Sequence, residues 1–256
     1  MTTISLHGRT SLITGGGRGI GAEIARAFAA AGANLVLIGR SADQLASVAA
    51  QAQELGVSAR VITADLSQRK DLDKVIAEAG AIDILVNNAS VKQRYLHCTD
   101  WPEDYLREAF EVGFWAPAIL MREIGKSMAA RKSGVILNIS STAGVRTAPH
   151  LGHYSAFKAA IDMVTRATAI ELARFGVRAL SIAPGGIDTG HHGLADSGAL
   201  CAPVGRIGLV TDVAQLATFL ASDAASFMTG HVIPCDGGLS AGEFTRHAPP
   251  YLSRVE

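Results

Sequence analysis

Hydrophobic and polar residues follow one another along the chain in a repeating order: a short apolar run, a turn, and then a longer, Ala-rich amphipathic run. The short runs predict strands at Ser11–Ile13, Asn34–Ile38, Ala59–Ile62, Ile82–Val86, Val135–Ile139, Val177–Ile182 and Val232–Ile233. The longer runs predict helices at Gly19–Ala31, Asp43–Leu55, Asp71–Ala79, Pro102–Ala130, His153–Phe175 and Thr211–Leu220. Strands that are apolar throughout and alternate with helices indicate an α/β fold, with a parallel sheet covered on both faces.

This alternation also sets the expected domain organisation. Right-handed crossovers wind such a sheet in both directions, which gives a doubly wound architecture. No Pro- or Ser-rich linker and no block of like charge divides the chain, so we predict a single domain over residues 1–256. The repeating order of apolar and amphipathic runs stops at Ile187–Pro203, where Gly, His, Asp and Ser interrupt it. Because this segment follows a strand end, we expect a loop or a short helical lid at about residues 187–203.

Composition narrows the classes of function. The chain has 256 residues, 23 Lys and Arg against 23 Asp and Glu, and 48% hydrophobic residues. Zero net charge without a basic cluster argues against a nucleic-acid partner, and the apolar content argues against disorder. Three cysteines without a CxxC pair predict neither a disulfide framework nor a zinc site. The chain starts without a secretion-signal pattern, and its apolar stretch nearest to a membrane span contains Arg26 and Asn34. We therefore expect a cytoplasmic protein with no membrane partner.

A glycine-rich turn after the first predicted strand favours a phosphate ligand. The segment reads Thr14, then Gly-Gly-Gly-Arg-Gly-Ile-Gly to Gly21, and fits the spacing Thr-Gly-x-x-x-Gly-x-Gly. Glycines permit positive φ and let backbone amides at a helix N-terminus approach a pyrophosphate. The predicted binding residues of this turn are Thr14, Gly15, Gly17, Arg18, Gly19, Ile20 and Gly21.

The end of the second predicted strand bears on the choice of cofactor. An acidic residue there usually binds the ribose hydroxyls of NAD, but this chain has Gly39-Arg40-Ser41. Arg40 is suited to a bidentate contact with a 2′-phosphate, and Arg18 supplies a second cation. We therefore predict that NADP(H) is preferred and that NAD(H) is possible. The alternative is that Arg40 is an ordinary solvated loop residue.

A tyrosine and a lysine four residues apart are the first candidates for catalysis. Tyr154 and Lys158 lie on one face of a predicted helix, so the phenol and the ammonium group point the same way. A tyrosine ionises near pH 10, so a role as general base requires a lower pKa, which a nearby cation favours. Ser141 follows the fifth predicted strand at its carboxyl end, where its hydroxyl can donate to a substrate oxygen.

Taken together, these landmarks resemble the short-chain dehydrogenase/reductase family over nearly the whole chain. Besides the glycine turn and Tyr154/Lys158, the matching signatures are Asp65-Leu66, Asn87-Asn88-Ala89, Ser140-Ser141, Pro184-Gly185 with Thr189, and Asp236-Gly237-Gly238. The resemblance implies a seven-stranded Rossmann sheet and reversible hydride transfer between NAD(P) and an alcohol/carbonyl pair. It also implies a homotetramer or homodimer that packs through the two long helices, Pro102–Ala130 and His153–Phe175.

The resemblance also assigns roles to single residues. It implies that Tyr154 is the acid/base, that Lys158 binds the nicotinamide ribose and lowers the tyrosine pKa, and that Ser141 orients the substrate oxygen. The further cofactor contacts that it implies are Asp65 at the adenine, Asn88 and Ala89 at the ribose, and Ile187 and Thr189 at the carboxamide. Leu66, Pro184 and Gly185 are also expected to bind the cofactor.

One departure from the family pattern affects the proton relay. The family typically has an asparagine in the long helix that positions a water for the lysine, and alignment places Gly113 there. Glycine holds no water through a side chain and costs a helix interior about 1 kcal/mol relative to alanine. One hypothesis is that an extra water fills the gap and catalysis persists. The other is that the relay is broken, which leaves a weakly active or non-catalytic dinucleotide-binding protein.

The residues expected around the substrate are polar and somewhat basic. The predicted contacts are Ser90, Ser141, His150, Tyr154, Gly186 and His191, and Lys92, Gln93, Arg94 and His153 are expected nearby. Such a lining suits a small hydroxylated or anionic alcohol or ketone better than a steroid. The adjacent His191 and His192 have no Cys or carboxylate cluster beside them, so we expect no metal. An NAD-linked polyol or sugar dehydrogenase remains the alternative within the same class.

Overall fold

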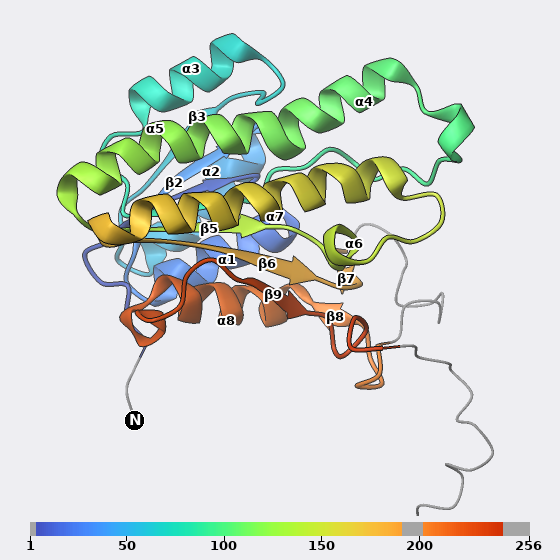
Figure 1. The fold of residues 1–256 in the computed structure, drawn as a ribbon. Coiled ribbons are helices and arrows are strands. Elements are labelled where there is room, and N and C mark those ends of the chain that lie inside the picture. Colours follow the sequence, from blue (N-terminus) through green and yellow to red (C-terminus); the bar gives the residue numbers. More distant parts are fainter. Residues whose placement is uncertain (1–3, 191–201, 243–256) are drawn as a thin grey trace, which may run out of the picture.

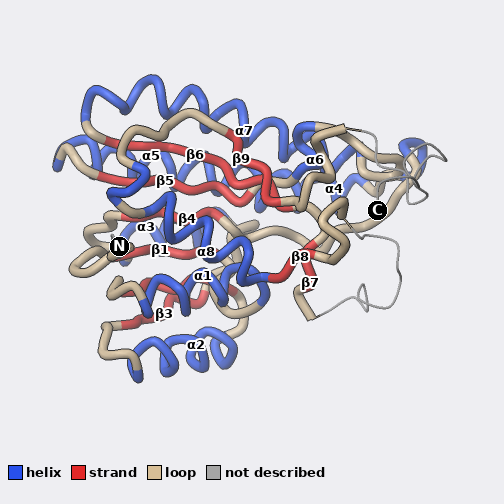
Figure 2. Tube along the Cα trace, turned by 90° about the horizontal axis from the view of Figure 1, so that it is seen from below, coloured by secondary structure: helices blue, strands red, loops and turns tan. Residues whose placement is uncertain are grey.

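The computed structural model describes residues 4–190 and 202–242, and seven parallel strands form its central sheet in the order β3-β2-β1-β4-β5-β6-β9. The bounds of these strands are β1 Thr10–Thr14, β2 Asn34–Gly39, β3 Ala59–Thr63, β4 Ile84–Asn87, β5 Gly134–Ile139, β6 Val177–Pro184 and β9 Val232–Cys235. Figure 2 shows this order across the molecule. All seven predicted strands are confirmed, each within two residues of its expected ends.

Helices cover both faces of the sheet (Figure 1). The helices on one face are α1 (Gly19–Ala30), α2 (Ala42–Glu54) and α8 (Val210–Ala221). Those on the other face are α3 (Arg69–Glu78), α5 (Ala116–Arg131) and α7 (Gly152–Leu172). The five inner strands of the sheet are mainly apolar because both of their faces are covered, whereas the edge strands β3 and β9 are partly exposed. In β2, Leu35 and Leu37 pack in the first layer, whereas Val36 and Ile38 pack in the second.

The structure differs from the predicted pattern in three places. The single helix expected at Pro102–Ala130 is divided into α4 (Glu103–Phe110), a π-helical turn at Glu111–Trp115, and α5. A short helix, α6 (Thr142–Val145), and a two-stranded sheet of β7 (Ile187–Asp188) and β8 (Gly208–Leu209) were not predicted. Most of the predicted lid, at residues 191–201, lies outside the described residues. The short helix α6 and strand β7 follow the carboxyl ends of β5 and β6, respectively.

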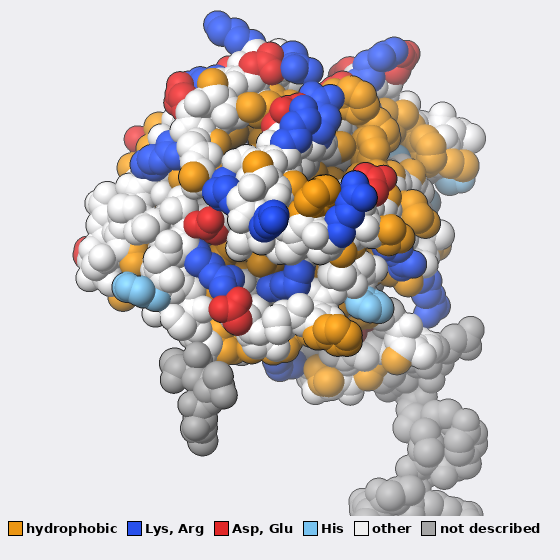
Figure 3. Space-filling view, turned by 60° about the vertical axis from the view of Figure 1, so that its left-hand side comes forward, with side chains coloured by type: hydrophobic (Ala, Val, Ile, Leu, Met, Phe, Trp, Pro, Cys, Tyr) orange, Lys and Arg blue, Asp and Glu red, His pale blue; other side chains and the backbone are white. Residues whose placement is uncertain are grey.

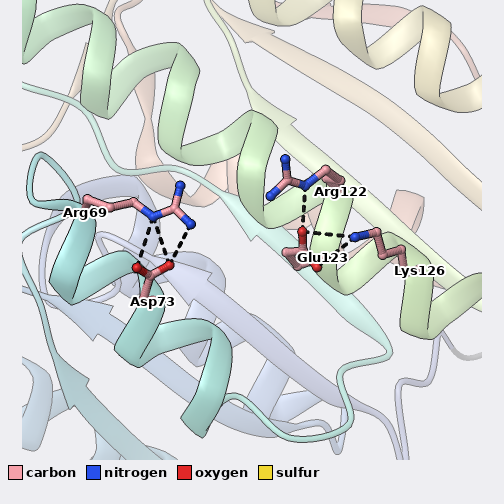
Figure 4. A network of polar contacts seen from close by, with 5 residues as sticks. All are labelled: Arg69, Asp73, Arg122, Glu123 and Lys126. Atoms are coloured by element: carbon pink, nitrogen blue, oxygen red, sulfur yellow. Dashed lines mark hydrogen bonds and ion pairs between the residues drawn. The ribbon is translucent and has the colours of Figure 1, made fainter.

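Charged side chains form ion pairs on the exposed faces of the helices. Figure 4 shows Arg69 and Asp73 paired along α3, and Glu123 of α5 between Arg122 and Lys126. These two cations, which donate hydrogen bonds to the carboxylate, hold the pKa of Glu123 below its usual value. Such exposed pairs contribute little to stability, so the apolar layers are the main source of the fold's stability. Figure 3 turns the left-hand side of Figure 1 forward, and there cationic and anionic side chains are interspersed.

No helix in residues 4–190 or 202–242 combines the length and hydrophobicity that a membrane span requires.

Candidate active site

Two adjoining cavities lie where the strands end. The glycine-loop cavity has a volume of about 940 Å³ and is lined by the turn after β1 and by residues that follow β2, β3 and β4. The tyrosine cavity has a volume of about 590 Å³ and is lined by residues that follow β5 and β6 and by the start of α7. Ile20, Asn88, Ser90, Gln93 and Thr189 line both cavities, so the two are continuous. In open α/β sheets this edge is where ligands bind.

The glycine turn is held in place by hydrogen bonds between β1 and β4. The Thr14 hydroxyl accepts from the backbone amides of Asn88 (2.9 Å) and Ala89 (3.0 Å), and Asn88 Nδ2 donates to the Thr14 carbonyl (3.0 Å). Gly15 has a φ of +66°, which favours glycine. A side chain on Gly21 would overlap the Gly15 carbonyl. Thr14 and Gly21 therefore shape the turn without lining either cavity.

The other predicted residues of the turn reach the cavity wall. The predicted cofactor residues that line the glycine-loop cavity are Gly15, Gly17, Arg18, Gly19, Ile20, Arg40, Asp65, Leu66, Asn88, Ala89 and Thr189. Arg40 is not a solitary loop cation, because its Nη1 lies 3.7 Å from Oε1 of Glu108 on α4. Lys92, which was expected near the substrate, lines this cavity instead.

The tyrosine cavity brings together the three residues predicted for catalysis. Ser141, Tyr154 and Lys158 line it, as do the predicted cofactor residues Pro184, Gly185, Ile187 and Thr189. Ser141 caps α6, its hydroxyl accepting from the Ala143 amide at 3.1 Å, while Tyr154 and Lys158 project from the first turns of α7. Lys158 Nζ donates to the Ile139 carbonyl at 2.7 Å and lies 5.7 Å from the centre of the Tyr154 ring.

Burial disfavours the charged forms of both titratable groups in this cavity. It raises the pKa of Tyr154 to about 12, and a hydrogen bond with Ser141 opposes that rise. It lowers the pKa of Lys158 to about 8, against the attraction of the Asp162 carboxylate. Lys158 is 4% exposed, so removal from water dominates its titration. In the protein alone the phenol is therefore neutral at pH 7, and the ammonium group is still charged.

The predicted substrate residues divide into two groups. Ser90, Ser141, Tyr154 and Gly186 line the tyrosine cavity, as does Gln93. His150, His153 and Arg94 line neither cavity. The His150 ring lies 6.0 Å from that of His97, the buried His153 packs edge-on against Tyr105, and Arg94 lies over the Tyr105 ring. His191 lies outside the described residues.

Residues that sequence reasoning missed also line the tyrosine cavity. Arg146 and Thr147 enter it from the segment after α6, and Tyr95 enters it from the loop after β4. Arg146 is held by a hydrogen bond from its Nη1 to the Gly242 carbonyl at 3.3 Å. Their position a few residues after Ser141 and Ser90, which follow strand ends, is the only signal in the sequence that points to them.

Gly113 makes room for an aromatic ring. It lies within the π-helical turn, and a Cβ at this position would be 2.6 Å from Cδ2 and Cε2 of Phe157. The buried Phe157 ring meets the Tyr154 ring edge-on at 5.1 Å. The first hypothesis from the sequence, an extra water, assumed a gap at Gly113. The structure corrects that premise, because Phe157 fills the space that an asparagine side chain would need.

Known proteins match this chain in sequence and in fold. A family model described as enoyl-(acyl carrier protein) reductase matches residues 15–240. The galactitol 2-dehydrogenase (L-tagatose-forming) of Cereibacter sphaeroides is 38% identical over 256 residues, covering 93% of this chain and 97% of that protein. A solved short chain dehydrogenase/reductase family protein superposes with a TM-score of 0.87 at 36% identity, over 93% of this chain and 100% of that one.

A third match includes ligands. The crystal structure of a gluconate 5-dehydrogenase from Burkholderia cenocepacia J2315, in complex with NADP and tartrate, superposes with a TM-score of 0.85. It is 34% identical and covers 94% of this chain and 98% of its own. The chain belongs to the short-chain dehydrogenase/reductase family and is an alcohol/ketone oxidoreductase.

Proposed function

We propose that the protein is an NADP(H)-preferring oxidoreductase that interconverts a secondary alcohol and a ketone, with Tyr154 as the acid/base. The observation that carries this proposal is the meeting of Ser141, Tyr154 and Lys158 on the wall of one cavity. That cavity opens into a second one built around a glycine turn. A hydride donor in one cavity would thus lie beside a proton donor in the other.

The glycine turn fits a dinucleotide. A Cβ on Gly15 would lie 2.8 Å from Asn88 Nδ2, and one on Gly17 would lie 3.0 Å from Cβ of Gln44, so the turn accepts glycine best at both positions. Helix α1 begins at Gly19, and its first turn contains no acidic residue. Bare backbone at a helix N-terminus is suited to a pyrophosphate. When bound, a nicotinamide dinucleotide supplies or accepts the hydride.

The chain's own residues perform the proton chemistry. In reduction, Tyr154 Oη gives its proton to the carbonyl oxygen, and in oxidation it takes the proton of the alcohol. The Ser141 hydroxyl donates to the same substrate oxygen and stabilises its developing negative charge. Because burial raises the pKa of Tyr154, its phenolate needs a nearby positive charge. The Lys158 ammonium group provides that charge at pH values below about 8.

The cations of the glycine-loop cavity favour NADP(H). Arg40 follows β2, where an acidic residue would repel a 2′-phosphate, and Arg18 and Lys92 line the same cavity. An arginine fork binds phosphate in a bidentate manner. The gluconate 5-dehydrogenase relative was solved with NADP, which supports the same choice. An NAD-linked polyol dehydrogenase is the second candidate, because the galactitol relative is a polyol dehydrogenase by name.

The lining of the tyrosine cavity supports a small polar substrate. Gln93, Arg146 and Thr147 place an amide, a guanidinium group and a hydroxyl on the wall that also contains Ser141 and Tyr154. Galactitol is a polyol, and gluconate is a hydroxy acid, so the named relatives act on substrates of this polarity. We therefore propose a hydroxylated or anionic alcohol or ketone. Carboxylates would pair with Arg146.

The proposed assembly is a homodimer or homotetramer. The exposed hydrophobic side chains Phe110, Trp115, Met163 and Ile170 belong to α4, the π-helical turn and α7. Such exposed apolar groups on neighbouring helices are typical of a subunit interface.

Initial rates of NADP⁺ and NAD⁺ reduction over polyols, sugars, hydroxy acids and plain secondary alcohols test this function. We expect turnover with one polar class and a lower KM for NADP⁺. Tyr154→Phe should lower kcat by about 10³-fold and leave the Kd of NADPH within about threefold, because it removes only the transferable proton.

Tyr105→Phe is the matched control. It also removes one phenol, but the Tyr105 hydroxyl donates to the Lys92 carbonyl (3.2 Å), and the residue lines neither cavity. Equal turnover of the two variants would refute the role of Tyr154, and no binding of either dinucleotide would refute the proposed cofactor.

A further inference from the structure

We propose that Glu108 is a specificity-determining residue that weakens NADP(H) binding and favours NAD(H). It does so by pairing with Arg40 and by placing a carboxylate beside the expected position of the 2′-phosphate. This inference rests on the proposed dinucleotide site, and it deepens that proposal. The expected effect of Glu108 is to reduce the proposed preference for NADP(H) without reversing it.

The geometry places Glu108 at the same end of the cavity as Arg40. Arg40 follows β2, whereas Glu108 belongs to α4, so the pair joins two elements that are distant in the sequence. Arg40 Nη1 and Glu108 Oε1 are 3.7 Å apart, and both residues line the glycine-loop cavity. The side chains are 63% and 44% exposed, so each can still reach a ligand. The neighbouring Arg107 bonds to Glu103 instead, which leaves Glu108 beside Arg40.

The charges around this pair explain its effect on the cofactor. Arg18, Arg40 and Lys92 are the cations on the wall of this cavity, and Asp65 and Glu108 are its carboxylates. To bind Arg40, a 2′-phosphate must break the ion pair between Arg40 and Glu108. The phosphate then lies near a Glu108 carboxylate that no longer has a cation as its partner, and the two negative charges repel each other. The 2′-hydroxyl of NAD(H) has no charge and can donate a hydrogen bond to that carboxylate.

Glu108 therefore supplies from α4 the acidic group that is missing after β2. An acidic residue at the end of β2 would bind the ribose hydroxyls and repel a 2′-phosphate. Here an arginine and a glutamate are both present, on separate elements. The two cofactors thus meet different partners in one cavity, and the ion pair between those partners sets the ratio of their affinities.

Fluorescence titration of the whole protein with NADPH and NADH tests this inference. Glu108→Gln keeps the size of the side chain and removes its charge. We expect the Kd of NADPH to fall about three- to tenfold, while the Kd of NADH stays the same or rises. The gain for NADPH should shrink as salt is added, because salt screens interactions between exposed charges.

Glu111→Gln is the matched control, and Glu108→Ala is a second variant. Glu111 is exposed in the adjoining π-helical turn and lines neither cavity, so the same change of charge there should leave both Kd values within about twofold. If both Glu108 variants leave the NADPH/NADH ratio within twofold of the parent, the inference is overturned but the dinucleotide site stands. If the parent binds neither dinucleotide, the proposed function and this inference fail together.

Discussion

Lys158 combines a positive charge with nearly complete burial, and this combination has a consequence for stability. Burial lowers the pKa of Lys158 from 10.5 to about 8, so the folded protein releases this proton at a lower pH than the unfolded chain does. The cost of burying the charge is fully present below pH 8. It disappears as the pH rises to 10.5, because the folded lysine is then neutral while the unfolded one is still charged.

Unfolding by denaturant at a series of pH values tests this sign. Relative to Lys158→Met, the free energy of unfolding of the parent should rise by up to about 3 kcal/mol between pH 8 and pH 10.5. The difference between the parent and the variant removes the contribution of all other titrating groups, because both proteins contain them. A difference that is flat or falls with pH would show that Lys158 titrates normally in the folded state.

Gly113 and Phe157 should behave as a coupled pair. A side chain at position 113 would lie 2.6 Å from the Phe157 ring, so Gly113→Asn alone should cost about 2–3 kcal/mol through overpacking. Phe157→Ala alone should cost about 3–5 kcal/mol through the cavity that it leaves. In the double variant the asparagine occupies part of that cavity. We expect the double variant to be more stable, by at least about 1 kcal/mol, than the sum of the two losses implies.

Chemical denaturation of all four proteins measures this coupling, and additive losses would contradict it. The same pair decides how the proton relay is tested. Kinetics of Gly113→Asn alone would mix overpacking against Tyr154's neighbour with any gain of a water. The relay is therefore tested by comparing the double variant with Phe157→Ala, since both lack the ring that contacts Tyr154.

The residues of the site differ in how far they could be predicted from the sequence. Tyr154 and Lys158 were predictable because their relation is local, four residues apart on one helix. The departure of Gly113 from the expected family pattern was also visible. Its partner Phe157 was not recognised, because the two residues meet only when the π-helical turn packs against α7. Glu108 was missed for the same reason, since Arg40 lies on a distant element.

At the scale of the elements, the contact between β1 and β4 is the part that positions the glycine turn. The Thr14 hydroxyl accepts two backbone amides from the end of β4, at 2.9 and 3.0 Å. Thr14→Val keeps the shape of the side chain but leaves both amides without this acceptor, and each costs about 1–3 kcal/mol. We expect the free energy of unfolding to fall by about 2–6 kcal/mol and NADPH binding to weaken.

Thr14→Ser is the control for this change, because it keeps the hydroxyl and loses only a methyl group. Thermal unfolding and NADPH titration of both variants give the comparison. If the valine variant is as stable as the serine variant, the threonine does not fix the turn through its hydroxyl.

Element prediction succeeded where burial on two faces gave a clear signal. The inner strands of the sheet were found because both of their faces are covered, so their apolar runs are nearly continuous. The edge strands β3 and β9 are partly exposed, and their shorter apolar runs were still recognised. The division of the long helix was not found, since the apolar period of α4 continues through the π-helical turn into α5. The β7–β8 pair has two residues per strand, which is too short to leave a pattern. Both missed features lie beside the cavities.

At the scale of the whole molecule, the exposed apolar side chains of α4, the π-helical turn and α7 predict self-association. Ile170 is 81% exposed, Met163 is 64% exposed, and Trp115 is 47% exposed. Met163 and Ile170 are seven residues apart on α7 and therefore share one face of that helix. Leaving these groups in water costs free energy that a second copy of the chain would recover by covering them.

Sedimentation of the parent should therefore give a dimer or a tetramer, and Ile170→Glu should shift it towards smaller species, because a buried unpaired charge at an interface is costly. Leu55→Glu provides the control: Leu55 is 55% exposed at the end of α2, on the opposite face of the sheet. It should leave the assembly unchanged. A monomeric parent, or equal dissociation by both variants, would exclude this surface as the interface.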